Sequence, residues 1–370
     1  MSQFPRILLL TNVPAPYRLP VFEALAEHVA LTVLFCEGED PARRWSVDLD
    51  SCRARYEVLP SRRLSLPGGA GMILNPGLAS RLRETPFDVY VAGENFSSFP
   101  AVLALQRAAR RWKKPLVIWS EAIDTAYASG RGLSNAYRRW LYRRSDAFIA
   151  YCRRAKEYLV RRGAPDDRIV VGRQVVPSEQ LPPPAVDKVA LGLKGKRVTL
   201  SVGYLISRKG VDILIKAFRS VAGNDDVLAL VGSGPEESRL RAMAVEDPRI
   251  LFRGHLDGAE KTSWYAAADL FVFPTLHDPW GLVVNEAMHF GLPIIASDAA
   301  GCVPDVVQDN GLVVPAGDVK ALSAALARLL EDSSLRSEMG ERSRAIISRY
   351  TVDAACGAFL DVIGRVLDGG

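Results

Sequence analysis

Two carboxylates, Asp278 and Glu286, flank Gly281 at the start of an expected helix. The apolar run 270–273 precedes them, and a glycine and a proline follow, so the segment is predicted to run strand, loop, helix, strand. The first N–H groups of a helix have no partner within it and carry partial positive charge, which suits a phosphate. We expect one acid to bind a sugar ring, the other a ribose, and the helix start a diphosphate. The alternative is that Glu286 only caps or solvates the helix.

Two adjacent cations, Arg208 and Lys209, follow the apolar run 198–202 and the turn at Gly203. A helix is expected to begin near Val211. Cations at such a strand-to-helix turn can neutralise the charge that develops on a leaving diphosphate. The alternative for an Arg-Lys pair in a loop is solvated surface.

The segment 275–301 resembles the acidic-x7-acidic signature of retaining GT-B glycosyltransferases, in particular the group 1, or family-four, type. Asp278 stands where that family usually has Glu, and Trp280-Gly281 match its aromatic-Gly pair. Lys209-Gly210 match the family's K-G, whereas Tyr204 stands where its Arg usually lies. The resemblance implies catalytic roles for Asp278, Glu286 and Lys209. Arg208 is the candidate to supply the charge of the family arginine that Tyr204 replaces.

Two further turns resemble nucleotide-binding turns of the same family. The segment 231–236 resembles its V-G-x-G-P turn, whose glycines keep side chains away from the nucleotide, and 252–256 lies where its base-binding turn lies. The donor-binding residues that the resemblance implies are Gly203, Gly232, Gly234, Gly254, His255, Leu256, Trp280, Gly281, Leu282 and Glu286.

The first half of the chain lacks the histidine that the family often places after the strand near Pro115, and Glu121 lies near that position. Glu121 is a candidate base for the acceptor proton, since burial in a closing cleft raises a carboxyl pKa. The alternative is that Glu121 orders a loop through hydrogen bonds. Glu94 and Asn95 are further candidates, and Arg18 is either an anion contact or a surface pair.

The composition of the 370 residues, 48% hydrophobic and 24% charged, is that of a soluble globular protein with about two domains. No apolar run approaches the roughly 20 residues that span a bilayer. Five scattered cysteines without C-x-x-C spacing indicate reduced cytosolic thiols. We expect no metal and no cofactor, because no Asp-x-Asp pair sits on a suitable loop.

Basic charge is concentrated in the first half. Residues 1–180 hold 27 Lys and Arg against 18 Asp and Glu, and residues 181–370 hold 20 against 24. The runs RRWKK at 110–114 and RRWLYRR at 138–144 could lie against anionic lipid head groups, or they could be solvated helix faces. Nucleic-acid binding is not expected, because the chain has no helix-turn-helix, zinc or RNA-sheet motif.

Short apolar runs alternate with amphipathic segments, which predicts parallel sheets covered on both faces. The expected strands are 7–11, 30–35, 89–92, 116–119, 147–151, 198–202, 227–231, 250–252, 270–273, 294–296 and 312–314. We predict the α/β GT-B fold, with two doubly wound Rossmann-like domains facing across a cleft. The first domain, residues 1–178, is expected to bind the acceptor, and a linker follows at 179–196. The second domain, residues 197–350, is expected to bind the nucleotide sugar, and residues 351–370 are expected to form a helix that returns to the first domain.

The leading hypothesis is a retaining glycosyltransferase that moves a sugar from a nucleotide-diphosphate sugar to a hydroxyl of a carbohydrate or glycolipid acceptor. We expect it in the cytoplasm or on the inner face of the cytoplasmic membrane. Two alternatives stay open: a nucleotide-sugar epimerase of the same fold, and a non-catalytic subunit that binds a nucleotide sugar.

Overall fold

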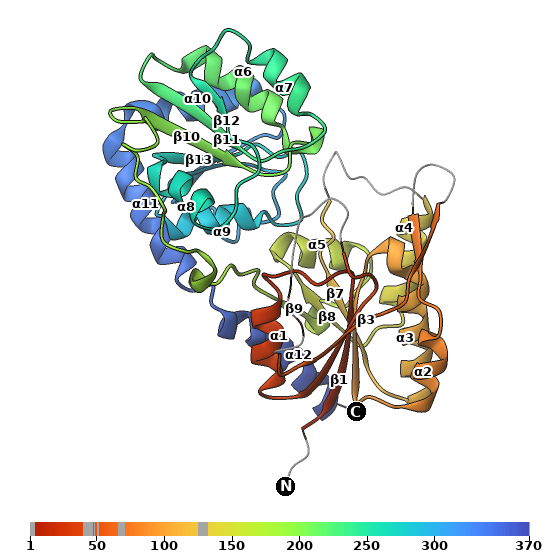
Figure 1. Cartoon of the computed structure of the whole chain (residues 1–370). Helices are drawn as coiled ribbons and strands as arrows, with labels where there is room; N and C mark the ends of the chain where they lie inside the picture. Colours follow the sequence, from red (N-terminus) through yellow and green to blue (C-terminus); the bar gives the residue numbers. More distant parts are fainter. Residues whose placement is uncertain are drawn as a thin grey trace. The chain divides into compact units, whose positions relative to one another are not determined.

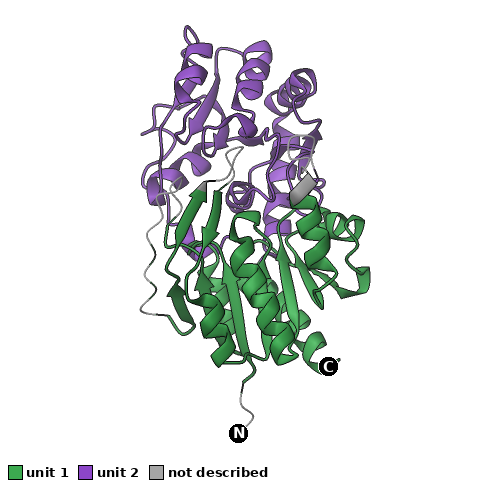
Figure 2. Cartoon of the chain, turned by 90° about the vertical axis from the view of Figure 1, so that its right-hand side faces the viewer, with its two compact units in different colours: residues 1–123, 130–174, 351–370 green, residues 124–129, 175–350 purple. Residues whose placement is uncertain are grey.

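The computed structural model describes residues 4–39, 47, 49, 52–65, 71–124 and 132–369. The chain divides into two compact units, coloured separately in Figure 2. Unit 1 consists of residues 1–123, 130–174 and 351–370, and unit 2 of residues 124–129 and 175–350. The chain therefore leaves unit 1 after Gln174 and returns to it at Thr351.

Unit 1 is built on a parallel sheet of seven strands in the order β3-β2-β1-β6-β7-β8-β9. Its strands are β1 (Arg6–Thr11), β2 (Ala30–Phe35), β3 (Arg55–Val58), β6 (Val89–Gly93), β7 (Leu116–Ser120), β8 (Ala147–Ala150) and β9 (Ile169–Val171). The run from Ile7 to Leu10 is buried at every position. Burial of consecutive residues requires cover on both faces of the sheet.

Helices supply that cover in unit 1. Figure 1 shows α1 and α12 on one side of the sheet and α2 and α3 on the other. The helices are α1 (Leu19–Ala26), α2 (Leu78–Glu84), α3 (Phe99–Trp112), α4 (Gly132–Tyr142), α5 (Arg153–Arg161) and α12 (Val352–Asp368), with short 3₁₀ turns η1 (Phe96–Ser98) and η2 (Asp166–Arg168). The last helix of the chain, α12, packs on α1, β8 and β9.

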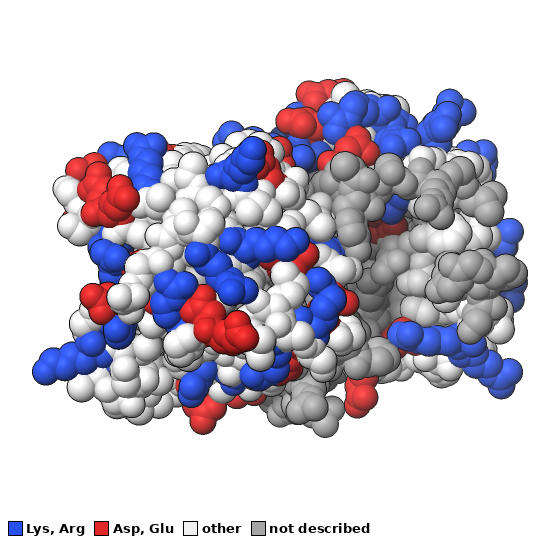
Figure 3. Space-filling model, turned by 90° about the horizontal axis from the view of Figure 1, so that it is seen from above, with Lys and Arg blue, Asp and Glu red and all other residues white. Residues whose placement is uncertain are grey.

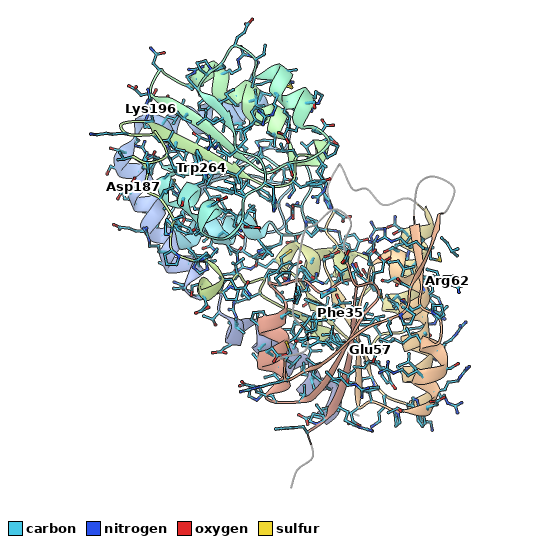
Figure 4. The ribbon with its side chains drawn as sticks, viewed as in Figure 1. Phe35, Glu57, Arg62, Asp187, Lys196 and Trp264 are labelled. Atoms are coloured by element: carbon cyan, nitrogen blue, oxygen red, sulfur yellow. The ribbon has the colours of Figure 1, made fainter. Side chains whose placement is uncertain are left out.

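An antiparallel hairpin, β4 (Arg62–Ser65) and β5 (Gly71–Leu74), stands apart from the main sheet of unit 1. Figure 4 labels Phe35 at the end of β2 and Glu57 on β3. The Phe35 ring stacks on Tyr56 with centroids 5.9 Å apart, which joins the edge strand β3 to the core.

Unit 2 repeats the design with a six-stranded parallel sheet in the order β12-β11-β10-β13-β14-β15. Its strands are β10 (Arg197–Val202), β11 (Asp226–Val231), β12 (Ile250–Phe252), β13 (Leu270–Phe273), β14 (Ile294–Ser297) and β15 (Gly311–Val314). Its helices are α6 (Val211–Val221), α7 (Glu237–Met243), α8 (Gly258–Ala267), α9 (Leu282–His289), α10 (Val319–Glu331) and α11 (Ser333–Ile347), with 3₁₀ turns η3 (Ser178–Gln180) and η4 (Ser207–Lys209).

The core of unit 2 lies between its sheet and the pair α6 and α10, which pack on each other. Phe218 on α6 and Leu326 on α10 are fully buried there. On the other side, α9 contacts β13 and β14, and α8 contacts β10. Figure 4 labels Trp264 on α8, a buried ring that lies 4.9 Å from the guanidinium of Arg253.

All eleven strands expected from apolar runs are present, and the predicted α/β fold class with two parallel-sheet Rossmann-like domains is confirmed. The strands β3, β4, β5 and β9 were not predicted, because each has only three or four residues. In addition, β3 and β4 carry charged residues such as Arg55 and Arg62. Within the described residues, no helix has the length and apolar character needed to span a membrane.

Candidate functional site

The strand order of unit 2 reverses between β10 and β13, which pair with each other. After β10 the chain continues to β11 and β12 on one side of the sheet, and after β13 it continues to β14 and β15 on the other side. The loops that leave the carboxyl ends of β10 and β13 therefore lie next to each other. Ligands of open α/β sheets bind at such a reversal point. The two loops carry Arg208 and Lys209 after β10, and Asp278 after β13.

Backbone contacts fix the two loops against each other. The carbonyl of Arg208 accepts hydrogen bonds from Leu276 N at 2.7 Å and from Thr275 Oγ1 at 3.0 Å. Gly210 has φ +65°, and a Cβ there would lie 2.2 Å from Pro274 O. The glycine of the K-G pair is therefore required by close packing of the two loops, and this packing sets the position of the preceding lysine.

Asp278 and the two cations form one cluster. Lys209 Nζ lies 2.5 Å from Asp278 Oδ2, and Arg208 NH1 lies 3.4 Å from the same oxygen. Arg208 also donates to His277 O at 2.7 Å, and Asp278 Oδ1 accepts from Trp280 N at 3.1 Å. Burial favours the neutral acid, but the lysine and arginine outweigh it, so the pKa of Asp278 lies below its usual range.

The glycine-rich turn after β11 packs against the loop after β10. A Cβ on Gly232 would lie 1.9 Å from Gly203 O, and one on Gly234 would lie 2.4 Å from Leu205 O. These glycines are needed because the two protein backbones come into contact there. The family resemblance implied a different role for them, which is to keep side chains away from the nucleotide. By contrast, a Cβ on Gly203 or Gly254 would meet no atom within 4 Å.

Helix α9 begins after Gly281, which has φ +101°. A Cβ there would lie 2.5 Å from the Phe273 ring, so two independent constraints require glycine. The indole of Trp280 is only 4% exposed and donates from Nε1 to Asn285 Oδ1 at 2.9 Å. Trp280 therefore packs in the interior, while Leu282, the first residue of the helix, is partly exposed.

Glu286 lies in the second turn of α9 and is held by two side chains of α8. Its Oε1 lies 3.0 Å from Lys261 Nζ, and its Oε2 accepts from the Tyr265 hydroxyl at 2.7 Å. Burial and this carboxylate raise the pKa of Tyr265 well above its usual value. The sequence analysis missed Lys261 and Tyr265, although their spacing of four residues places both on one face of a helix.

The turn after β12 carries Gly254, His255 and Leu256. Gly254 O accepts from Gly232 N at 2.7 Å, which joins this turn to the glycine-rich turn after β11. His255 is exposed and Leu256 is partly exposed. The structure thus brings Gly203, Gly232 and Gly254 to one edge of the sheet, the edge that also carries Lys209.

Glu121 belongs to unit 1, where it follows β7. Its side chain is 44% exposed and lies 3.9 Å from Arg18 NH2. Arg18 is not a surface residue: its NH1 donates to Thr11 Oγ1 at 2.8 Å, and its guanidinium lies 4.8 Å from the Trp119 ring. The structure places Arg18 and Glu121 together at the carboxyl edge of the sheet.

Glu94, which follows β6, is the more deeply buried acid of unit 1, with only 3% of its surface exposed. It accepts a hydrogen bond from Tyr142, and its Oε1 lies 3.4 Å from Arg138 Nε. Burial raises the pKa of Glu94, and the charge of Glu121 adds to this, although Arg138 and hydrogen bonds from Tyr142 and Ser120 oppose it. Burial that raises a carboxyl pKa was expected at Glu121, but the structure shows it at Glu94.

This raised pKa predicts how stability depends on pH. The folded chain holds the Glu94 proton more tightly than the unfolded chain, whose pKa is about 4.5. The resulting stabilisation is complete below pH 4.5 and is lost as the pH rises through the folded pKa. We expect Glu94→Gln to gain stability relative to the wild type between pH 4 and pH 8 in urea unfolding. A difference that stays constant with pH would contradict the burial argument.

The chain matches two family models that together cover most of its length. Residues 14–172 match the glycosyl transferase 4-like domain, and residues 196–332 match glycosyl transferases group 1. The second range contains the whole cluster around Asp278 and both strands that carry it.

Curated relatives bear glycosyltransferase names. A GDP-mannose-dependent monoacylated alpha-(1-6)-phosphatidylinositol monomannoside mannosyltransferase of Corynebacterium glutamicum is 38% identical over 38% of this chain and 40% of its own length. A D-inositol 3-phosphate glycosyltransferase of Xylanimonas cellulosilytica is 29% identical over 70% of this chain and 68% of its own length. For the first of these, the match spans less than half of the relative.

Solved structures support the same fold. The Anabaena protein HepE, solved in complex with UDP and glucose, superimposes with a TM-score of 0.76 at 18% identity, covering 98% of this chain and 100% of HepE. The sucrose-phosphate synthase of Thermosynechococcus elongatus has a TM-score of 0.74 at 18% identity, covering 98% of this chain and 99% of the synthase. The two family models show that the chain belongs to the group 1 glycosyltransferases, and the solved structures show that it has the GT-B fold.

Proposed function

We propose that the protein is a retaining glycosyltransferase that moves a sugar from a nucleotide-diphosphate sugar to a hydroxyl group of a carbohydrate or glycolipid. The observation that carries the proposal is the cluster of Lys209, Arg208 and Asp278 beside the start of α9. Two cations and a helix N-terminus on adjacent loops of a reversal point form a site for a diphosphate.

The cluster supplies the electrostatics of the reaction. When the bond between the sugar C1 and the diphosphate breaks, negative charge develops on the departing oxygen, and Lys209 with the α9 start stabilises it. The acceptor oxygen bonds to C1 on the same face, and its proton passes to the departing diphosphate. Asp278 holds Lys209 and Arg208 in place, because both cations contact its Oδ2.

Metal independence is part of the proposal. Lys209, Arg208 and the amide groups at the start of α9 provide the positive charge that a divalent cation would otherwise supply. The described residues hold no group of three or more His, Cys, Asp or Glu side chains arranged to bind a metal ion.

Contact with a membrane surface is the remaining part of the proposal, and the named acceptor lipid of the Corynebacterium relative favours it. The face drawn in Figure 3 carries Lys and Arg side chains interspersed with Asp and Glu, as on an ordinary solvated surface. The proposal places the attraction to anionic lipid at the basic runs 110–114 and 138–144 of unit 1.

A donor screen tests the proposed activity. Uridine, guanosine and adenosine diphosphate sugars are compared by thermal unfolding, since a ligand at 100 times its dissociation constant stabilises the fold by about 2.7 kcal/mol. We expect one base to give a clear stabilisation, and sugar transfer to a hydroxyl acceptor with that donor. Conversion of the donor sugar without acceptor would favour the epimerase alternative, and binding without turnover would favour the non-catalytic subunit.

A further inference from the structure

A pocket of about 880 Å³ opens in unit 1, at the edge of the sheet where β7 and β8 begin. Its walls come from the end of α3, the starts of β7 and β8, the turn η2 and the last turns of α12. Figure 1 shows the C-terminal end of the chain near the amino-terminal edge of this sheet. Pockets of this volume are of the size that holds small organic ligands.

The pocket is strongly basic. Arg110, Lys113, Arg143 and Arg168 line it, and none of these four side chains forms an ion pair with another of the described residues. They come from both basic runs of the sequence, 110–114 and 138–144, and from η2. In the part of the chain that the structure describes, seven cations and two carboxylates, Asp146 and Asp167, line the pocket. This excess of positive charge favours an anionic occupant.

Three more cations of the pocket already have partners. Lys114 Nζ lies 3.2 Å from Asp88 Oδ1, Arg365 pairs with Asp361, and the Arg144 guanidinium lies 5.0 Å from the Trp140 ring. One of the lining carboxylates, Asp146, accepts a hydrogen bond from Leu116 N at 2.8 Å. The helix ends nearby attract some of these cations, because a helix C-terminus carries partial negative charge. Attraction to the end of an α-helix does not explain the position of Arg168, because this residue lies on the short 3₁₀ turn η2.

Gln106 adds an independent observation. This residue of α3 also lines the pocket and is only 3% exposed, yet its Nε2 has no hydrogen-bond partner within the described structure. Buried amide donors are nearly always paired. Because the Nε2 atom itself is shielded from solvent, it reaches an acceptor in the pocket only when the Gln106 side chain turns toward it. Gln106 and Arg110 are four residues apart, which places them on one face of α3, and Lys113 directly follows the last residue of that helix.

We propose that this pocket binds the phosphate group of a small organic molecule. Arginine side chains match phosphate oxygens in paired hydrogen bonds, and the Gln106 amide supplies a neutral donor to the same group. Val362 and Val366 of α12 provide apolar wall for the organic part. The bound molecule joins α3 to α12, and so stabilises the return of the chain to unit 1.

The site is separate from the proposed acceptor residues. Glu121 follows the carboxyl end of β7, whereas Leu116, at the other end of the same strand, lines the pocket. A strand of this length spans roughly 13 Å. The pocket is therefore a second binding site, and its occupation need not block sugar transfer.

The test measures binding of pyrophosphate to the full chain by calorimetry. It uses the Lys209→Met background, because the proposed donor site would also bind this probe. In this background, we expect the double substitution Arg143→Glu and Arg168→Glu to weaken pyrophosphate binding more than tenfold. We expect Gln106→Met to weaken binding severalfold and to raise the Tm of the ligand-free protein, because it removes an unpaired buried donor. The matched control is Arg107→Glu, an exposed arginine of α3 outside the pocket, which should change binding less than twofold.

A second arm identifies the source of the phosphate. The same variants, with Lys209 intact, are mixed with phosphatidylcholine vesicles that contain or lack phosphatidylglycerol. If the Arg143→Glu and Arg168→Glu variant loses vesicle binding and Arg107→Glu does not, the site binds a lipid head group. If the protein binds pyrophosphate but not vesicles, the site binds a soluble phosphate compound. Absence of both, or equal losses in Arg107→Glu, would overturn the proposal. Neither arm depends on sugar transfer, so the result is distinct from that of the donor screen.

Discussion

The Lys209→Met variant is expected to lose affinity for a nucleoside diphosphate by on the order of 10- to 100-fold, as removal of one charge-assisted hydrogen bond implies. Methionine keeps the packing on Phe273, whose ring centroid lies 5.1 Å from the Lys209 ammonium, and removes only the charge. The loss should be specific to the diphosphate. Calorimetry should therefore show almost unchanged affinity for the nucleoside without phosphate.

The control for this variant is Lys216→Met, which alters an exposed lysine of α6 in the same unit. We expect it to bind the diphosphate like the wild type. Equal affinity of Lys209→Met and Lys216→Met would reject Lys209 as a diphosphate ligand. A Lys209→Met variant that lost nucleoside binding as well would indicate collapse of the loop rather than loss of one contact.

The same variant also tests the role of Asp278. Without Lys209, Arg208 at 3.4 Å is the one cationic partner that the buried carboxylate keeps among the described residues. Removing one partner of a buried pair leaves an uncompensated charge, which destabilises a protein by about 3–5 kcal/mol when no other partner is present. Combining Lys209→Met with Asp278→Asn should recover part of this loss of stability, because no isolated charge then remains.

Glu286→Gln should weaken nucleotide binding about tenfold through loss of contact with the ribose hydroxyls. Glutamine keeps the shape of the side chain and can still accept from the Tyr265 hydroxyl, but it removes the charge opposite Lys261. A 2′,3′-dideoxy nucleotide lacks the hydroxyls in question. We therefore expect wild type and variant to bind the dideoxy analogue with equal affinity.

The matched control is Glu260→Gln, which removes an exposed carboxylate of α8. It should leave the binding of both nucleotides unchanged. If Glu286→Gln weakened the dideoxy nucleotide as much as the ribonucleotide, the effect would come from the lost pair with Lys261 and not from a ribose contact. The capping or solvating role that the sequence left open for Glu286 would then be the better account.

The strands could be predicted from the sequence because burial on both faces leaves an uninterrupted apolar run, as from Ile7 to Leu10. The edge strand β3 has no such run: Arg55 is exposed and Glu57 is only partly buried. Its place in the sheet depends on pairing with β2 and on the stacking of Tyr56 on Phe35. Contacts of that kind join distant parts of the chain and leave no local pattern.

The site could be predicted in part. Spacing and family resemblance pointed to Asp278, Lys209 and Glu286, and the structure brings the first two together. It could not be predicted that Glu286 is held by Lys261, because that contact depends on how α8 packs beside α9. Nor could the sequence show that Gly232 is required by the backbone of Gly203, since glycine is compatible with many environments.

We propose that a nucleoside diphosphate binds unit 2 between Lys209 and the start of α9. The decisive experiment is a crystal structure of the protein with the nucleoside diphosphate selected by the donor screen. We expect phosphate density within hydrogen-bond distance of Lys209 Nζ and the first amide groups of α9, with the ribose hydroxyls at Glu286. Phosphate density elsewhere, with Lys209 still paired only to Asp278, would contradict it.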